Sequence, residues 1–313
     1  MYDVVALGEL LIDFTTQSID SDGYPTMAAH PGGAPANFLA AIAKFGGKVG
    51  MLGKVGTDTF GKLLTNTLRG AGIETKGLVA ADDVFTTLAF VTLDENGDRE
   101  FAFARKPGAD TQLTFDELDL SLIDETRVFH FGTLSLTGEP ARTTTYRAVE
   151  YAKAHGKLVT YDPNLRKPLW NDLNEAKKQM LWGLRQADVV KISDEEVEFL
   201  FGLGVQDGAQ YILDHYPVKL VFVTCGADGC WFQNRNAGGH VDSLKDIKVV
   251  DTTGAGDIFG GSAVWKLLQT GKRPEDLDEA ELTQIVSFAC RAAGLSTTKH
   301  AAFRVCPILY LRP

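Results

Sequence analysis

The stretch Asp251-Thr252-Thr253-Gly254-Ala255-Gly256-Asp257 joins a strand-like run, Ile247–Val250, to a run of helical periodicity at Ile258–Gln269. Its two glycines allow a tight turn between the strand and the helix. Backbone N–H groups at the start of such a helix point at one spot, and the helix dipole favours negative charge there. The stretch therefore predicts a phosphoryl-binding turn at the edge of an α/β sheet, with Asp257 in the first helical turn.

Short runs rich in Val, Ile and Leu alternate with helical periodicity along the rest of the chain. The predicted strands are Val4–Leu7, Val49–Leu52, Val128–Phe131, Leu158–Tyr161, Val189–Ile192 and Leu220–Val223. The predicted helices are Ala36–Phe45, Asp58–Gly70, Ala141–His155, Glu175–Gln186, Asp194–Phe201, Ile258–Gln269 and Leu282–Leu295. This alternation is typical of a doubly wound, mostly parallel sheet with helices on both faces, and we expect residues 1–313 to form one such α/β domain.

One segment interrupts the alternation. The strand-like runs Thr86–Asp94 and Arg99–Arg105 are joined by Glu95-Asn96-Gly97-Asp98, and Asn-Gly is a strong signal for a tight hairpin. A hairpin inserted into an α/β chain lies outside the main sheet. We therefore expect a small β-hairpin lid, built from about residues 13–17 and 86–105, that covers a ligand or a second subunit.

The composition excludes several classes of protein. A formal net charge of −10 without clustered Lys and Arg disfavours binding to nucleic acid or to an anionic membrane. We find no apolar run long enough to span a bilayer and no pattern of a signal peptide. The four scattered cysteines form no CxxC pair and suit reduced thiols. We expect a cytoplasmic protein whose partners are small molecules.

A second glycine motif, His30-Pro31-Gly32-Gly33-Ala34-Pro35-Ala36-Asn37, places an amide side chain at the start of a helix. An amide donates and accepts hydrogen bonds, which suits recognition of a polyol, although a plain glycine loop with a surface Asn is the alternative. Further along, Gly53, Gly56 and Gly61 surround Asp58. We interpret Asp58 as the N-cap of the helix that follows it.

Two familiar nucleotide-binding motifs fail in this sequence. The run from Gly56 to Lys62 matches seven positions of a P-loop, but Leu63 stands where that motif needs a hydroxyl for Mg²⁺. The run from Gly254 to Gly260 has one residue too many for a dinucleotide fingerprint, and it lies near the C-terminus. These mismatches disfavour a P-loop protein and a nicotinamide-dependent dehydrogenase.

Taken together, the two glycine motifs and the Asp58 segment resemble those of the PfkB (ribokinase-like) carbohydrate kinases, and within that family the bacterial fructokinases are most similar. The resemblance extends over about residues 4–299. It implies an ATP-dependent sugar kinase that phosphorylates a primary hydroxyl, with D-fructose giving fructose 6-phosphate. It also implies ATP and Mg²⁺ as cofactors, with K⁺ as a further option. Relatives often pair through the lid as homodimers, and a monomer is the alternative.

The resemblance assigns a role to each matching residue. Asp257 is the catalytic base, and Gly254, Ala255 and Gly256 form the anion hole around the γ-phosphate. The implied sugar-binding residues are Asp13, Gly32, Gly33, Asn37, Phe103, Arg105, Asn164 and Arg166. The implied ATP-binding residues are Lys191, Ser193, Thr224, Gly226 and Gly229, together with Gly254 and Gly256.

Several of these residues keep a structural alternative. Asp257 has the sequence context of an N-terminal helix cap. Glu196 is implied to bind Mg²⁺ through water, yet Ser193 and Glu196 also have the spacing of a capping box. If they do not contact the sugar, Phe103 is an ordinary aromatic side chain in a cross-strand pair, and Arg105 is an Arg exposed to solvent. Gly226 and Gly229 suit a plain turn, and Asp162, just before Asn164, is interpreted as a turn residue.

The C-terminal part departs from the family. The resemblance implies that Asp251 and Thr253 bind a monovalent cation, but Ala301 replaces the usual glycine, which argues against that site. The substrate also has alternatives. A 2-keto-3-deoxygluconate kinase would use Arg105 and Arg166 for the carboxylate of its substrate, and ribose or a nucleoside are further candidates. A non-catalytic sugar-binding relative is the alternative of a different class, which the intact Asp257 disfavours.

Overall fold

The computed structural model describes residues 1–93 and 99–298. The strands of its large sheet are β1 (Tyr2–Leu7), β4 (Val49–Gly56), β5 (Ile73–Glu74), β6 (Leu78–Ala81), β9 (Thr126–Gly132), β10 (Leu158–Asp162), β11 (Val189–Ser193), β12 (Leu220–Thr224), β13 (Cys230–Asn234) and β14 (Gly238–Val241). Their order is β14-β13-β12-β11-β10-β9-β1-β4-β5, with β6 also paired to β4. Neighbours from β12 to β5 run parallel, and β13 and β14 are antiparallel additions at one edge.

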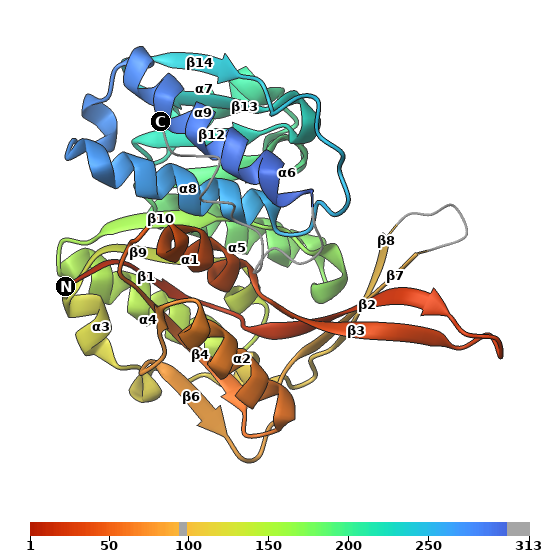
Figure 1. The fold of residues 1–313 in the computed structure, drawn as a ribbon. Coiled ribbons are helices and arrows are strands. Elements are labelled where there is room, and N and C mark those ends of the chain that lie inside the picture. Colours follow the sequence, from red (N-terminus) through yellow and green to blue (C-terminus); the bar gives the residue numbers. More distant parts are fainter. Residues whose placement is uncertain (94–98, 299–313) are drawn as a thin grey trace.

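Helices cover both faces of this sheet (Figure 1). One face carries α1 (Ala34–Lys44), α2 (Thr59–Gly70), α8 (Ala255–Thr270) and α9 (Glu279–Ser296). The other face carries α3 (Leu120–Asp124), α4 (Ala141–Ala154), α5 (Leu173–Gln186), α6 (Asp194–Phe201) and α7 (Val205–His215). Side chains of a strand alternate between faces, so Val4 and Ala6 of β1 pack with α1, while Val5 and Leu7 pack with α4 and α5. The predicted doubly wound α/β fold is confirmed.

The predicted elements agree with the structure except at a few segments. The six predicted strands and seven predicted helices are all present. The elements that were not predicted include α3, α7, β5, β6, β13 and β14. The strand prediction for Ile247–Val250 was wrong, because this run is not part of a sheet. Val249 is 55% exposed, and the N–H groups of Val250 and Asp251 both donate to the carbonyl of Thr297, at 2.8 and 3.0 Å. The β-branched residues of this run favour strands, and this propensity led to the wrong prediction.

A second, four-stranded sheet extends away from the body of the protein (Figure 1). This small sheet consists of β2 (Leu11–Ile19), β3 (Pro25–Gly32), β7 (Leu88–Leu93) and β8 (Arg99–Ala104), in the order β3-β2-β7-β8. The predicted pairing of β7 with β8 is present and antiparallel, while the Asn96-Gly97 turn lies outside the described residues. The small sheet is larger than the predicted lid, since β3 had the appearance of a glycine loop.

The base of the small sheet is tied to α2. Asp58 caps α2, as predicted, by accepting hydrogen bonds from the N–H groups of Phe60 and Gly61 at 2.8 and 3.0 Å. Its second carboxylate oxygen accepts from both the N–H and the hydroxyl of Thr86, just before β7. Phe14 of β2 packs edge-on against Phe60 with ring centroids 5.5 Å apart. These contacts fix the root of the small sheet on the body.

Two predictions about the whole chain can be compared with the described residues. Cys225, Cys230 and Cys290 are free thiols there, while Cys306 lies outside the described part. None of the helices between residues 1 and 93 or 99 and 298 combines the length and apolar character that crossing a bilayer requires.

Candidate active site

The residues that the sequence singled out lie at the carboxyl ends of the parallel strands, where α/β sheets bind ligands. Asp162 ends β10, Ser193 ends β11 and Thr224 ends β12. Here the first turns of α1 and α8 meet, because the two helices are joined by a hydrogen bond between Asn37 and Asp257. The fold thus brings the two glycine motifs, far apart in sequence, to one place.

Helix α8 begins with the geometry that the glycine turn requires. Its N-cap, Gly254, has φ 76°, a left-handed conformation that glycine adopts without strain. The carbonyl of Gly254 accepts the first helical hydrogen bond, from the N–H of Ile258 at 2.9 Å. The N–H groups of Gly256 and Asp257 belong to the first turn, which an α-helix leaves without acceptors of its own. This turn is chemically suited to an anion.

Asp257 is buried, with 7% of its surface exposed, and it is held by Asn37. The Asn37 Nδ2 donates to Oδ2 of Asp257 at 2.9 Å. Burial raises the pKa of Asp257, while the Asn37 hydrogen bond, Lys191 and Arg166 act to lower it. Among the residues the structure describes, the buried Oδ1 of Asn37 has no hydrogen-bond partner. A ligand hydroxyl could donate to that oxygen, and the burial of Asn37 argues against the alternative of a surface Asn.

Asp13 faces the same place from β2 of the small sheet. Its carboxylate lies over Gly32 of the paired strand β3, where a Cβ would be only 2.1 Å from Oδ2 of Asp13. Burial raises the pKa of Asp13 to about 7, with Arg166 lowering it and Asp257 and Asp251 raising it. Arg166, Asp257 and Asp251 are therefore the charged groups that influence Asp13.

Two left-handed backbone conformations lie beside these residues. Gly33, the N-cap of α1, has φ 114°, and a Cβ there would be 2.4 Å from the carbonyl oxygen of Glu9. Asn164 is buried and left-handed, with φ 46°, just after β10. An Asn tolerates this conformation better than most residues do. The Asp162–Asn164 segment therefore makes a tight turn that leads directly to Arg166.

A buried ion pair lies behind the anion turn. Nζ of Lys191 is 3.1 Å from Oδ2 of Asp162. Burial raises the pKa of Asp162 to about 7, although Lys191 acts to lower it. The same ammonium lies 2.9 Å from the position of a Cβ at Gly256. The interpretation of Asp162 as a turn residue missed this role, and its place at the end of a buried strand was the available signal.

Glu196 forms the capping box that its spacing indicated. Its Oε2 accepts from the N–H of Ser193 at 2.9 Å, and its own N–H donates to Oγ of Ser193 at 3.2 Å. Its Oε1 accepts from the N–H of Leu165 at 2.6 Å. Each carboxylate oxygen keeps a second lone pair, so Glu196 can still hold a cation through water. The described residues contain no cluster of three or more His, Cys, Asp or Glu side chains that could hold a metal ion.

The alternative that Arg105 is a solvent-exposed side chain is wrong. It is buried, and Nε and Nη2 donate to Oδ2 of Asp110 at 2.9 and 2.7 Å. It also donates to the Thr137 hydroxyl at 2.8 Å and to the Leu134 carbonyl at 3.0 Å. Phe103 lies on β8, opposite Ala89 of β7. Arg105 thus ties the end of β8 to the body of the protein.

The loop after β12 is a tight turn with two left-handed glycines. Gly226 and Gly229 have φ 53° and 98°, and a Cβ on Gly229 would be 2.1 Å from the Val241 carbonyl oxygen. The N–H of Cys225 donates to the Gly229 carbonyl at 2.8 Å. The turn is confirmed, while its contact with a nucleotide, like that of Thr224, stays a prediction.

The predicted cation ligands lie in the stretch before α8. The N–H of Thr253 donates to Oδ1 of Asp251 at 2.9 Å, so this carboxylate organises the turn. Ala301, the replacement that argued against the cation site, lies outside the described residues. The monovalent cation site therefore stays a prediction.

Three buried carboxyls of this region make the stability of the protein depend on pH. Burial raises the pKa of Glu9, Asp13 and Asp162 to about 7 in each case. Between about pH 4 and about pH 7 these three carboxyls bind more protons in the folded protein than in the unfolded chain, so their contribution to stability falls as pH rises. Burial lowers the pKa of His130 to about 3, and this one group acts in the opposite direction below about pH 6.5. We expect the melting temperature of the ligand-free protein to fall from about pH 5.5 to about pH 8 at constant ionic strength.

Differential scanning fluorimetry of the wild type and of Asp13→Asn measures this effect. The melting temperature of the variant should fall less with rising pH, because one carboxyl with a raised pKa is removed. Carboxyls with lowered pKa values, such as Asp58, are ionised throughout this range and do not contribute to the slope. A melting temperature that rises with pH in both proteins would contradict the buried, proton-binding state of these groups.

Comparisons with known proteins identify relatives of this chain in sequence and in fold. A family model described as pfkB family carbohydrate kinase matches residues 1–307. Fructokinase-1 of Zea mays is 43% identical over 308 residues, which are 97% of this chain and 94% of that protein. The crystal structure of fructokinase with bound ATP from Xylella fastidiosa has a TM-score of 0.91 at 30% identity, covering 99% of this chain and 98% of that chain. Fructokinase from Vibrio cholerae O395, in a form with fructose, ADP and calcium ion, has a TM-score of 0.86 at 32% identity, covering 99% and 98%.

Proposed function

The chain belongs to the pfkB family of carbohydrate kinases, and from that premise we propose that it is a fructokinase that transfers the γ-phosphate of ATP to O6 of D-fructose. The observation that carries the proposal is the buried pair of Asn37 and Asp257 at the first turn of α8, 2.9 Å apart. A carboxylate, an amide with a buried acceptor and a phosphate-binding helix turn meet there. Relatives named fructokinase match this chain over nearly its whole length.

In this mechanism Asp257 accepts the proton of the sugar hydroxyl. Oδ2 is already bonded to Asn37, so Oδ1 is the oxygen available for the proton. The bond from the sugar oxygen to the γ-phosphorus forms as the bond from that phosphorus to the bridging oxygen of ADP breaks. The negative charge that spreads over the phosphoryl oxygens is stabilised in this proposal by the N–H groups of Gly254 and Gly256 and by the α8 dipole. The N–H of Ala255, which the resemblance also assigns to the anion hole, donates to the Thr252 carbonyl at 3.2 Å. Lys191, held by Asp162, adds positive charge beside Gly256.

The sugar is held from both sides in this proposal. Asp13 and Asn37 accept hydrogen bonds from its hydroxyls, the backbone of Gly33 lies against it, and Gly32 leaves room for Asp13. Phe103 packs on the ring from the small sheet. Asn164 and Arg166 approach from the end of β10, and Arg105 lies at the base of the small sheet. Such a set of positioned polar groups suits a polyol.

ATP is held by the loops that follow β11 and β12. Lys191, Ser193, Thr224, Gly226 and Gly229 are the proposed contacts. A divalent cation, Mg²⁺ in the proposal, neutralises phosphate charge when bound, and Glu196 would hold it through water. Asp251 and Thr253 would hold K⁺ if a monovalent ion is used. The homodimer through the small sheet also belongs to the proposal, and a dimer mass in light scattering tests it.

The keto-acid alternative is weakened by the ion pair of Arg105. A carboxylate substrate would need two cationic groups in the proposed arrangement, and Arg105 is already bound by Asp110 at 2.7 Å. Arg166 alone would then have to bind the substrate carboxylate. This observation favours a neutral sugar.

A coupled ADP-release assay with ATP and Mg²⁺ tests the function against fructose, 2-keto-3-deoxygluconate, ribose and adenosine. We expect kcat/KM for fructose to exceed each of the others by at least about 100-fold, the range that loss of site hydrogen bonds produces. Phosphorus NMR of the product should show a 6-phosphate. A higher kcat/KM for any other acceptor would overturn the assignment of fructose.

A further inference from the structure

The N-cap residue of helix α1 makes no side-chain hydrogen bond to the first turn of the helix. Most helices start at Ser, Thr, Asp or Asn, whose side chain accepts a first-turn N–H. Here the N-cap is Gly33, which has no side chain to accept one. A larger residue is excluded, because φ is 114° and a Cβ would be 2.4 Å from the Glu9 carbonyl oxygen. The first turn therefore needs an acceptor from elsewhere.

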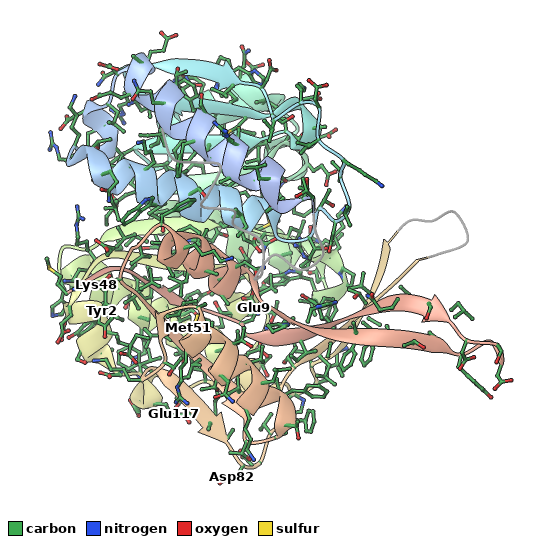
Figure 2. All side chains as sticks on the ribbon, in the orientation of Figure 1. Tyr2, Glu9, Lys48, Met51, Asp82 and Glu117 are labelled. Atoms are coloured by element: carbon green, nitrogen blue, oxygen red, sulfur yellow. The ribbon has the colours of Figure 1, made fainter. Side chains whose placement is uncertain are left out.

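Glu9 supplies that acceptor from 25 residues earlier in the chain. Its Oε1 accepts the N–H of Ala34, the first residue of α1, at 2.8 Å. The side chain is 2% exposed, and Figure 2 shows it where the strands of the small sheet leave the body. A carboxylate at a helix N-terminus is also favoured by the helix dipole.

The capped helix carries Asn37 in its first turns. The backbone of α1 is rigid, so the placement of Ala34 sets where the Asn37 amide points. That amide donates to Asp257 at 2.9 Å. On the basis of the proposed function, we propose that Glu9 is a positioning residue, which caps α1 from outside the helix and so aligns Asn37 with Asp257 and with the sugar.

Glu9 also stands between the two elements that present sugar-binding side chains. It lies two residues before β2, which carries Asp13, and it caps α1, which carries Asn37. The charged groups that face it are Arg105, after β8, and Asp110, in the short 3₁₀ helix Ala109–Gln112. Glu9 is therefore placed to keep Asp13 and Asn37 in a fixed relation.

Two substitutions separate capping from simple charge balance. Glu9→Gln keeps an acceptor oxygen at the same reach and removes the charge. Glu9→Asp keeps the charge, but its side chain is one methylene shorter and cannot reach Ala34 in the same way. If Glu9 acts as a cap, the Asp variant should raise KM for fructose about tenfold and the Gln variant less than about threefold. If charge balance with Arg105 were the role, the order would be reversed.

KM for ATP should change less than KM for fructose in both variants, because Lys191, Ser193, Thr224, Gly226 and Gly229, the contacts proposed after β11 and β12, all lie outside α1. Hydrogen exchange of residues 32–38 gives a readout that does not depend on substrate. We expect faster exchange in the Asp variant than in the wild type and the Gln variant, because the Ala34 N–H loses its acceptor.

Asn234→Leu is the matched control. Asn234 is also buried and also holds turn backbone, since its Oδ1 accepts the N–H groups of Asn236 and Ala237 at 2.9 and 2.8 Å. This variant should lose stability without a rise in KM for fructose. The proposal is overturned if the Asp variant keeps the wild-type KM and exchange, or if the Gln variant is the worse of the two. A wild type inactive on fructose would refute the fructokinase proposal, while exchange would still decide whether Glu9 caps α1.

Discussion

Replacing Asp257 with Asn is expected to lower kcat by about 10³-fold, within the range for loss of a general base. The amide has the size of the carboxylate and can still accept the hydrogen bond from Asn37, but it cannot take the proton of the sugar hydroxyl. Binding of fructose should change little, because the contacts to the other hydroxyls remain. The expected signature is therefore a fall in kcat with a nearly constant KM for fructose.

Steady-state ADP release and calorimetric titration with fructose measure the two parts of this prediction. Asp172→Asn is a suitable control, since Asn also caps helices and Asp172, the N-cap of α5, lies outside the proposed site. Its kcat should stay close to that of the wild type. Turnover of Asp257→Asn within tenfold of the wild type would exclude Asp257 as the base.

Replacing Asn37 with Asp should lower kcat/KM at neutral pH by about 100-fold, because it sets a second carboxylate against Asp257. The amide donor that lowers the pKa of Asp257 is lost, and the like charge raises the pKa of the pair further. A base must be deprotonated to act, so the acid limb of the profile of kcat/KM against pH moves to higher pH. We expect a shift of at least about one pH unit, with activity partly recovered in alkaline buffer.

The pH profile from about pH 5 to about pH 9 tests this result, with Asn37→Leu as the comparison. The Leu variant also loses the hydrogen bonds of Asn37 but adds no charge. Its kcat/KM should fall, while its acid limb moves less than that of the Asp variant. Superimposable limbs for Asn37→Asp and the wild type would show that residue 37 does not influence ionisation of the base.

Much of the fold was predictable because buried parallel strands and amphipathic helices have distinct periodicities. The glycine turn before α8 was also predictable, since Gly254 needs a left-handed conformation that few other residues adopt. β3 was not predicted, because its Ala, Pro and Gly residues lack the alternation of a half-buried strand. Ile247–Val250 failed for the opposite reason: its residues favour strands, but the run lies outside the sheet and the N–H of Val250 donates to the Thr297 carbonyl instead.

The site was predictable where a residue acts within a local motif and not where it acts through a distant partner. Asp257 and Asn37 lie in glycine motifs that mark helix starts. Asp162 and Glu9 follow strands without such a mark, and their partners, Lys191 and Ala34, lie 29 and 25 residues away. Only the fold brings these atoms together, so local sequence patterns could not assign their roles.

The hydrogen bond between Asn37 and Asp257 joins residues 220 positions apart. During synthesis, α1 leaves the ribosome long before α8 does. Asn37 therefore cannot form its hydrogen bond with Asp257 until the strands between the two helices have been synthesised. Contacts of such long range form late, after much chain entropy has been lost. Catalytic activity therefore reports completion of folding, and a chain truncated before α8 could retain much of its sheet and still have no base.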